Sequence, residues 1–353
     1  SLQVRVRHRR AQRLRSRLKE LGLWALDAPR EWGGAGLDAV TVVFLTTEQC
    51  KTTVGTAHRN PFGSFTDAFF YPVFRHASDY LKERYLYPVI RGEKDSALAQ
   101  TEPEAGSDAA AIKTTAERDG DYWVINGIKR FSTMADTADF IYVATVTEKG
   151  KGRAGHTTFI VDRDTPGLKM LRKIEVIRPQ YSTELAFDNV RIHDRQRLTE
   201  LGAGFRAVQA ALGTGRTKLA ASCLGRAERA QKMTIDYVKQ RATFGATLAT
   251  RQAIQWMLVD SHIEINATRL MALETAWKVD QGMDVRHEAS VIKLMATEMA
   301  YRVLDRSIQC HGGIGLTKDL PLERWLREVR VMRIVEGPSE VHKFVIARDL
   351  LRD

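Results

Sequence analysis

The sequence predicts an α+β fold in which an N-terminal helical region, a middle β region and a C-terminal helical bundle follow one another. Residues 96–200 contain short segments rich in β-branched and aromatic residues, such as "DYWVINGIKRFST", "DFIYVATVT", "TTFIVDRD" and "TELAFDNVRI". Residues 201–353 instead keep apolar residues three or four positions apart over many turns, which is typical of a bundle of long helices. Because strands and helices do not alternate, the sequence disfavours a doubly wound sheet.

The N-terminal region, residues 1–95, is predicted to be mainly helical. Segments such as "DAVTVVFLTTEQC" and "SDYLKERYLYPVI" have helical character and are separated by breaks at "PREWGGAG" and "HRNPFG". The first 20 residues hold seven arginines and one lysine against one glutamate, so most of the net charge of +11 lies there. Leu14, Leu18 and Leu21 fall on one helical face, so we interpret the arginines as the solvated side of an amphipathic helix. A basic arm that binds a polyanion and a transit peptide are the alternatives.

The composition is that of a globular chain. At 44% hydrophobic and 27% charged residues, the 353 residues can form two or three lobes. No apolar run approaches the roughly 18 residues of a membrane span, and no stretch has the pattern of a signal peptide. Cys50, Cys223 and Cys310 have neither zinc-ligand nor disulfide spacing. We therefore expect a reducing compartment, either the cytoplasm or the mitochondrial matrix of a eukaryote.

The one Gly-x-Gly of interest does not match a nucleotide-binding loop. "LGTGRTK", residues 212–218, lacks a third glycine at the dinucleotide spacing and lies within helical periodicity. The same periodicity runs through Leu219, Cys223, Ala227 and Ala230. A nucleotide cofactor would therefore have to bind in a way that differs from a Rossmann fold or a P-loop.

The loop "LAQTEPEAGSD", residues 98–108, offers groups that suit a polar ring edge or a phosphate. Pro103 and Gly106 break regular structure, and Thr101 and Ser107 supply hydroxyls. Taken alone, a capped turn explains this loop equally well. Downstream, Phe131 and Thr133 are two residues apart, so they share one face of the predicted strand. That spacing can press an aromatic ring and a hydroxyl against one planar ligand, although most such aromatic residues belong to the core.

Glu336 lies in "RIVEGPSEVHKFVIARDLL", just before an apolar pattern of helical period. We expect Pro338 to be the first residue of the final helix and Gly337 to be its N-cap. Burial by Ile334, Val335 and a bound apolar chain would raise the pKa of Glu336, whereas a helix N-terminus would lower it. The acid can therefore be a simple helix-start preference or a base held in a dry pocket.

Five motifs together resemble the acyl-CoA dehydrogenase family over essentially the whole chain: "TEPEAGSD", "INGIKRFST", "QRATFGATLATRQ", "IQCHGGIG" and "RIVEGPSEVHKFVIAR". The resemblance implies an N-terminal helical domain (1–95), a middle β barrel or sandwich (96–200) and a C-terminal four-helix bundle (201–353). It also implies an FAD-dependent enzyme of acyl-CoA metabolism and β-oxidation that makes a trans-2-enoyl-CoA. Such enzymes are usually homotetramers built from two dimers and pass electrons to an electron-transfer flavoprotein.

The resemblance also assigns cofactor contacts. Thr101 would bind the pyrimidine edge of the flavin with the backbone near Gln100, and Phe131 would pack on the ring. Thr133 would donate to flavin N5, and Ser107 with Gly106 would bind the pyrophosphate. The remaining cofactor contacts, several of them to the FAD of a neighbouring subunit, would come from Arg241, Phe244, Gln252, Gln309, Gly313, Pro338 and Glu340.

Glu336 would be the catalytic base in this family, and Arg216, Val335 and Gly337 would line the bound thioester. The backbone amide of Glu336 and the FAD ribityl hydroxyl would polarise the thioester carbonyl as enolate charge develops. The family's other base position lies near Gly215, where glycine cannot serve, so Glu336 remains the only candidate.

Some residues depart from the family pattern. Phe131 stands where many members have Trp, and Pro338 and Glu340 replace Thr and Gln. "GPSEVH" is similar to a subgroup with "DGPDEVH", whose base is Asp. The N-terminal helical region is shorter than usual, so we expect the printed chain to lack an N-terminal segment or loops.

Other polar residues receive a structural interpretation. His342 is expected to face the bundle, Cys310-His311 lacks metal-ligand partners, and we expect no metal site. Glu102 and Glu104 are two residues apart, but no apolar residues are expected to enclose them.

Two alternative functions remain. One is a flavin oxidase, nitroalkane oxidase or hydroxylase on the same fold. The other is a DNA-associated homologue of the alkylation-response type, which the arginine-rich start motivates. The residues after the first 20 carry little net charge, which disfavours nucleic acid as a partner.

Overall fold

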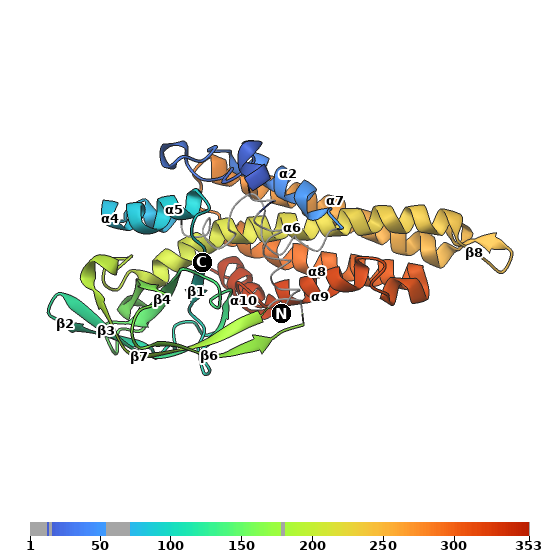
Figure 1. Cartoon of the computed structure of the whole chain (residues 1–353). Coiled ribbons are helices and arrows are strands. Elements are labelled where there is room, and N and C mark those ends of the chain that lie inside the picture. Colours follow the sequence, from blue (N-terminus) through green and yellow to red (C-terminus); the bar gives the residue numbers. More distant parts are fainter. Residues whose placement is uncertain (1–12, 14–15, 54–70, 178–180, 353) are drawn as a thin grey trace. The chain divides into compact units, whose positions relative to one another are not determined.

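The computed structural model describes residues 13, 16–53, 71–177 and 181–352. The described chain divides into two compact units (Figure 1). The first unit comprises Ser1–Leu37 and Arg59–Leu212, and the second comprises Asp38–His58 and Gly213–Asp353. The break at "HRNPFG" and most of the arginine-rich start lie outside the described residues.

A seven-stranded, mainly antiparallel sheet forms the middle of the first unit. Its strands follow the order β1-β4-β2-β3-β7-β6, and β5 pairs with β4. Only the pairings of β1 and of β2 with β4 are parallel. The strands are β1 (Ser96–Ala99), β2 (Thr115–Asp119), β3 (Tyr122–Thr133), β4 (Phe140–Val146), β5 (His156–Asp162), β6 (Leu168–Glu175) and β7 (Tyr181–His193). The four segments predicted to be strands are thus confirmed.

Short helices pack beside this sheet in the first unit. They are η1 (Arg30–Trp32), α4 (Asp79–Leu81), the π-helical turn η2 (Lys82–Leu86), α5 (Tyr87–Ile90), η3 (Gly152–Gly155) and η4 (Asp194–Gln196). Their aromatic side chains share a core with strand residues, in which the Tyr85 ring meets Phe140 edge-to-face at 4.8 Å. Such pairs add stability beyond the area that they bury.

The predicted apolar face of the first helix is only partly correct. Leu18 is buried, but Leu21 is 52% exposed. The helix ends at residue 20, and Leu21 and Gly22 form the turn after it, in which Gly22 adopts φ +67. Leu21 therefore does not share the buried helical face of Leu18. Leu14 lies outside the described residues.

Long helices that run side by side make up the second unit (Figure 1). They are α2 (Ala39–Cys50), α6 (Gly204–Gln240), α7 (Gln252–Asp280), α8 (Arg286–His311), α9 (Leu322–Met332) and α10 (Ser339–Leu350), and the first residues of α6 belong to the first unit. Short elements join these helices, namely β8 (Ala242–Thr243), β9 (Ala246–Thr247), η5 (Leu248–Thr250) and η6 (Gly312–Leu316). The predicted stripe of α6 is buried at Leu219, Cys223, Ala227 and Ala230. None of the described helices is both long and apolar enough to cross a membrane.

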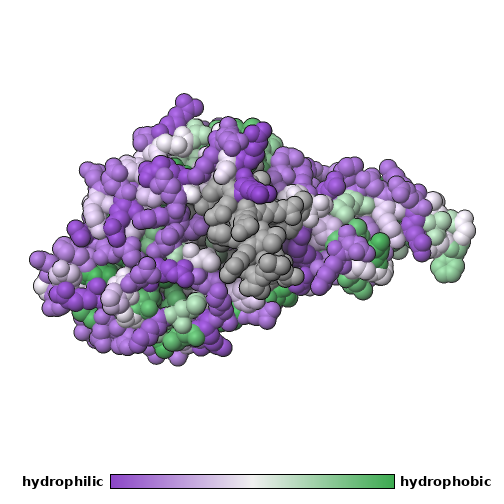
Figure 2. All heavy atoms as spheres, in the orientation of Figure 1, coloured by the Kyte–Doolittle hydropathy of each residue, from purple (hydrophilic) through white to green (hydrophobic). Residues whose placement is uncertain are grey.

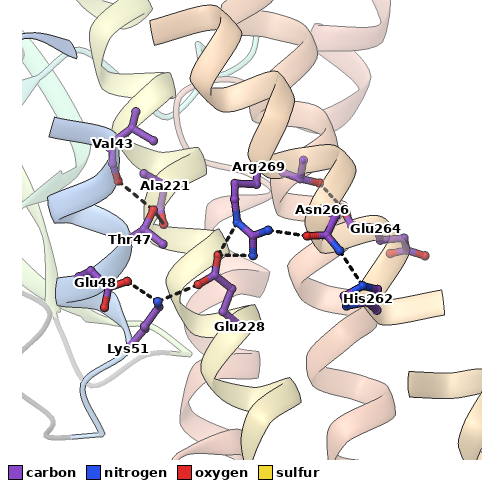
Figure 3. Close-up of polar contacts among 11 residues, drawn as sticks. Val43, Thr47, Glu48, Lys51, Ala221, Glu228, His262, Glu264, Asn266 and Arg269 are labelled. Atoms are coloured by element: carbon purple, nitrogen blue, oxygen red, sulfur yellow. Dashed lines mark hydrogen bonds and ion pairs between the residues drawn. The ribbon is translucent and has the colours of Figure 1, made fainter. Parts of the chain in front are cut away.

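Small residues and a polar network hold α2 against α6 and α7 (Figure 3). A Cβ on Gly225 would lie 2.1 Å from the Thr47 carbonyl oxygen, so only glycine permits this approach of the two backbones. Nearby, the Glu228 carboxylate lies 2.9 Å from the Lys51 ammonium and 2.9 Å from the Arg269 guanidinium. Arg269 also donates to Asn266, which extends the network along α7 (Figure 3). The network is partly exposed and its partners are satisfied, so it has a structural role.

The three cysteines are buried free thiols. Burial raises the pKa of Cys50, Cys223 and Cys310, that of Cys223 to about 12. A thiol with a raised pKa carries little thiolate and is a poor nucleophile at neutral pH. These side chains therefore contribute packing rather than chemistry.

Candidate active site

A buried ion pair fixes the loop that carries Thr101 in the first unit. The Glu102 carboxylate accepts hydrogen bonds from the Lys129 ammonium at 2.7 Å and from the amides of Lys113 and Thr114 at 2.6 and 2.9 Å. Lys129 is fully buried on β3 and also donates to the Gln100 carbonyl at 3.0 Å. Burial raises the pKa of Glu102, but the Lys129 charge and these hydrogen bonds outweigh that effect and hold the pKa below its ordinary value. Glu102 is thus buried, but its partners are polar and its pKa is lowered rather than raised.

β3 places Phe131 and Thr133 on either side of the buried Ser132. The register with β7 shifts between Lys129 and Ser132, and Phe131 adopts φ +59 at this bulge. Its ring remains 53% exposed. A left-handed backbone at an aromatic residue is uncommon and is found at functional positions. Both side chains stay accessible, as the two-residue spacing predicts, but a bulge rather than regular pleating produces the arrangement.

The loop and β3 bring several candidate cofactor residues together. The Arg130 amide donates to the Thr101 carbonyl at 2.8 Å, so Thr101 lies next to the residue that precedes Phe131. Further along the loop, Gly106 and Ser107 are exposed, and a Cβ on Gly106 would meet no other atom within 4 Å. The first unit therefore has an exposed aromatic residue beside the Thr101 backbone, and an open, hydroxyl-bearing stretch further along the same loop. This set of groups suits a flat heterocycle with a polar edge.

Glu336 occupies a left-handed turn between α9 and α10 of the second unit. Glu336 has φ +57, and Gly337 follows with φ +97. His342 Nε2 donates to the Glu336 carbonyl at 3.2 Å, and the Lys293 ammonium donates to the Gly337 carbonyl at 2.6 Å. The backbone angle favours glycine here, and a Cβ on Gly337 would in addition lie only 3.1 Å from His342 Nε2, so the imidazole would have to shift.

The final helix begins one residue later than predicted. The structure makes Pro338 the N-cap and Ser339 the first residue of α10, whereas the sequence predicted Gly337 and Pro338 for these positions. The left-handed angle of Gly337 and the extended ψ of 162° at Pro338 delay the start of the helix. Glu336 thus lies outside the helix, and its direction is set by the turn.

The Glu336 carboxylate is enclosed although the residue as a whole is half-buried. Its Oε2 atom is buried and has no hydrogen-bond partner within the described residues. Burial raises the pKa of Glu336 to about 7, against the opposing charges of Arg216 and Lys293. Ile334 and Val335, which the sequence predicts to bury the acid, are themselves 55% and 38% exposed.

Arg216 on α6 is the other cation beside this turn. Its Nη2 atom lies 3.4 Å from the Glu336 carbonyl, and its Nε atom is buried without a partner within the described residues. A buried donor without a partner is costly and points to a ligand that completes it. Gly215, one residue earlier, is buried and carries no side chain that could compete with Glu336 as a base.

The residues expected to reach a neighbouring subunit's cofactor are all accessible. Phe244 has φ +49 in the β8–β9 hairpin and is 99% exposed. Figure 2 shows apolar residues at this end of the second unit. Arg241, Gln252, Gln309 and Gly313 are also exposed, as is Glu340, which is expected to contact the cofactor.

Sequence reasoning missed two of the three buried polar residues beside the candidate groups. Lys129 lies within a quoted motif but was not singled out, and His342 was predicted to be a bundle residue, which its full burial confirms. Lys293 is fully buried four residues after Ala289 and three before Ala296, in the apolar stripe of α8. A lysine inside an apolar stripe is the signal that could have found it.

Comparisons with known proteins decide the family. The family described as acyl-CoA dehydrogenase matches in three parts: its N-terminal domain over residues 3–93, its middle domain over 97–190 and its C-terminal domain over 202–351. The chain belongs to the acyl-CoA dehydrogenase family. It is therefore an oxidoreductase, and the predicted fold class and dependence on FAD are confirmed. The exposed Phe131 side chain and the Thr101 loop, which the Glu102–Lys129 ion pair fixes, could bind the flavin ring of that cofactor.

Individual relatives support the same assignment. The chain is 41% identical to (R)-benzylsuccinyl-CoA dehydrogenase of Thauera aromatica, over 97% of this chain and 85% of that protein. It is 38% identical to 3-(aryl)acrylate reductase of Clostridium sporogenes, over 95% of this chain and 89% of that protein. The solved butyryl-CoA dehydrogenase from Megasphaera elsdenii has a TM-score of 0.88 and 31% identity, covering 96% of this chain and 89% of that chain.

Proposed function

We propose that this protein catalyses the α,β-dehydrogenation of an acyl-CoA thioester to a trans-2-enoyl-CoA, with Glu336 as the base. The observation that carries the proposal is the enclosed Glu336 carboxylate, whose pKa is raised to about 7. A general base works best when its pKa lies near the working pH. An acid that merely favoured a helix start would be solvated and would keep an ordinary pKa.

The chain's own residues would divide the work as follows. Glu336 takes the α-proton, and its backbone amide stabilises the developing charge on the thioester oxygen. Arg216, Val335 and Gly337 border the thioester. Bound FAD supplies the acceptor for the hydrogen and electron pair that leave the β-carbon.

Other residues of the chain would hold the cofactor. Thr101, Phe131 and Thr133 orient the flavin, helped by Gln100. Gly106 and Ser107 bind the pyrophosphate. We further propose that Arg241, Phe244, Gln252, Gln309, Gly313, Pro338 and Glu340 complete the cofactor sites of a homotetramer.

The acyl group is proposed to carry an aromatic ring. The support is that two relatives of at least 38% identity are named for a benzylsuccinyl-CoA and for aryl acrylates. A straight-chain acyl group is the competing choice, because butyryl-CoA dehydrogenase shares the fold.

We propose an electron-transfer flavoprotein as the electron acceptor. A solved structure described as "Electron transferring flavoprotein of Acidaminococcus fermentans: Towards a mechanism of flavin-based electron bifurcation" contains a chain with a TM-score of 0.89 to this one. The division into domains 1–95, 96–200 and 201–353 and the reducing compartment also stay proposals.

Anaerobic flavin bleaching tests the proposed reaction. The purified FAD-loaded protein is mixed with 3-phenylpropionyl-CoA, benzylsuccinyl-CoA, butyryl-CoA and octanoyl-CoA, and the flavin absorbance is followed. We expect an aryl-bearing thioester to bleach the flavin fastest. Bleaching by butyryl-CoA alone would overturn the aromatic assignment. No bleaching by any thioester, or oxygen uptake as fast as dye-linked turnover, would overturn the dehydrogenase assignment.

A further inference from the structure

The turn that carries Glu336 is held by side chains from other helices. Both of its left-handed residues offer their carbonyl oxygens to a buried donor. Lys293 of α8 donates to the Gly337 carbonyl at 2.6 Å, and His342 of α10 donates to the Glu336 carbonyl at 3.2 Å. Each side chain has a relative exposure of 0%. A strained turn persists only when its surroundings determine it, and these two donors do so.

Packing alone does not explain a lysine at position 293. A buried ammonium costs several kcal/mol unless it is paired, so an apolar residue would suit the α8 stripe better. The other acid near this turn, Glu298, already accepts from Arg333 at 2.9 Å and from Ser339 at 2.6 Å. The Glu336 carboxylate is the group whose Oε2 atom is buried without a partner within the described residues. Of these two acids, Glu336 is the one with an unpartnered carboxylate oxygen in the described part of the chain, and the Lys293 ammonium binds the carbonyl of the residue that follows Glu336.

We propose that Lys293 is the positioning residue of the catalytic base: its ammonium fixes the Glu336–Gly337 turn, and its charge favours the ionised form of the enclosed Glu336 carboxylate. This inference rests on the proposed function of Glu336. It makes the buried lysine part of the catalytic apparatus through its contact with the turn that carries the base.

The charges around Glu336 support this role. Arg216 on α6 is a permanent cation, but it is also a proposed substrate contact. Lys293 on α8 is not, so substituting Lys293 removes a positive charge without removing a proposed substrate contact. Burial, followed by the two cations, lowers the pKa of His342 on α10 to about 3, so His342 is neutral. Cys223 on α6 is protonated, because burial raises its pKa to about 12. Burial lowers the pKa of Lys293 to about 8, so it remains charged at pH 7.

Infrared difference spectroscopy of the FAD-loaded protein tests the proposal without any substrate. The carboxyl band of Glu336 is followed over pH and identified by its loss in Glu336→Gln. We expect the midpoint of this titration to rise by about one pH unit or more in Lys293→Met, since an opposite charge at this range shifts a pKa by that amount. Lys293→Arg should return the midpoint toward that of the wild type. Lys343→Met is the matched control, because Lys343 is exposed on α10.

Lys293→Gln separates the effect of the charge from that of the hydrogen bond. It also serves as the test variant if Lys293→Met does not fold. Lys293→Gln can still donate to the Gly337 carbonyl but has no charge, so we expect the same rise in the midpoint with the turn intact. An unchanged midpoint in a folded, FAD-loaded Lys293 variant would overturn the proposal.

Flavin reduction by an active thioester gives an independent readout. We expect Lys293→Met to be reduced about fivefold more slowly at pH 7 and to recover at high pH, since a rise of one unit from a pKa of about 7 lowers the ionised fraction at pH 7 from about one half to about one tenth. A merely structural role would lower the rate equally at every pH. If no thioester reduces the wild type, the proposed function fails, whereas the infrared titration still decides whether Lys293 governs Glu336.

Discussion

The Lys129 ammonium lies 2.7 Å from the Glu102 carboxylate in the interior of the first unit, and both side chains are almost fully buried. This pair joins β3, which carries Phe131, to the loop that carries Thr101. Two proposed flavin contacts are thereby set by residues that need not touch the flavin. The relation between the pair and the cofactor can be tested directly.

Lys129→Met should lower both stability and FAD content. The substitution leaves the Glu102 carboxylate buried without its cation, which typically costs about 3–5 kcal/mol. We expect a lower Tm and a protein that loses flavin on gel filtration. The double variant Glu102→Gln/Lys129→Met should recover much of the Tm, because no unpaired charge remains. A single variant that keeps wild-type Tm and flavin content would refute this role.

Gly337→Ala should lower the rate of flavin reduction more than it lowers the stability of the fold. Alanine at φ +97 is strained by about 1–2 kcal/mol, and its Cβ would press on His342 Nε2 at 3.1 Å. We expect FAD binding to persist while the rate of flavin reduction drops about tenfold or more, as a misplaced reacting group implies. Gly282→Ala is a suitable control, since Gly282 also has positive φ but nothing within 4 Å of its Cβ position. Equal losses of activity in the two variants would contradict the prediction.

Flavin reduction should rise with pH through neutrality. Glu336 acts as a base only when ionised, and its pKa is raised to about 7. The rate under saturating thioester should therefore be low near pH 5.5 and level off above about pH 8. Stopped-flow measurements of the rate of flavin reduction over this pH range check the predicted rise. A rate independent of pH between 5.5 and 8.5 would be incompatible with Glu336 as the titrating base.

The same pKa predicts a pH-dependent effect of Glu336 on stability. The folded-state pKa is raised above the ordinary value of 4.5, so the folded protein holds a proton that the unfolded chain loses. The contribution of the protonated Glu336 carboxyl to the free energy of unfolding is complete below about pH 4.5 and is lost as the pH rises through about 7. Glu336→Gln should therefore raise the Tm relative to wild type at pH 8 and less so at pH 5. A Tm difference that does not change with pH would contradict a raised pKa.

Sequence patterns predicted the order of strands and helices because periodicity reports which face of each segment is buried. They also pointed to Thr101, Phe131 and Glu336, since loop hydroxyls, an aromatic in a strand and an acid before a helix have local signatures. They failed for Lys293 and for the true start of α10. Lys293 acts through a contact 44 residues away, and the start of α10 depends on the left-handed angle of Gly337. The lysine does interrupt the apolar stripe of α8, but neither its partner on the turn nor the start of α10 is encoded in a local pattern.

Flavin bleaching by Glu336→Gln is the most direct test of the central claim. The variant is loaded with FAD, mixed anaerobically with a thioester that bleaches the wild type, and followed by stopped-flow absorbance. Because a general base typically contributes 10²–10⁴-fold, we expect full flavin content and a reduction rate lower by on the order of 10³-fold. A rate within tenfold of the wild type would show that Glu336 is not the base.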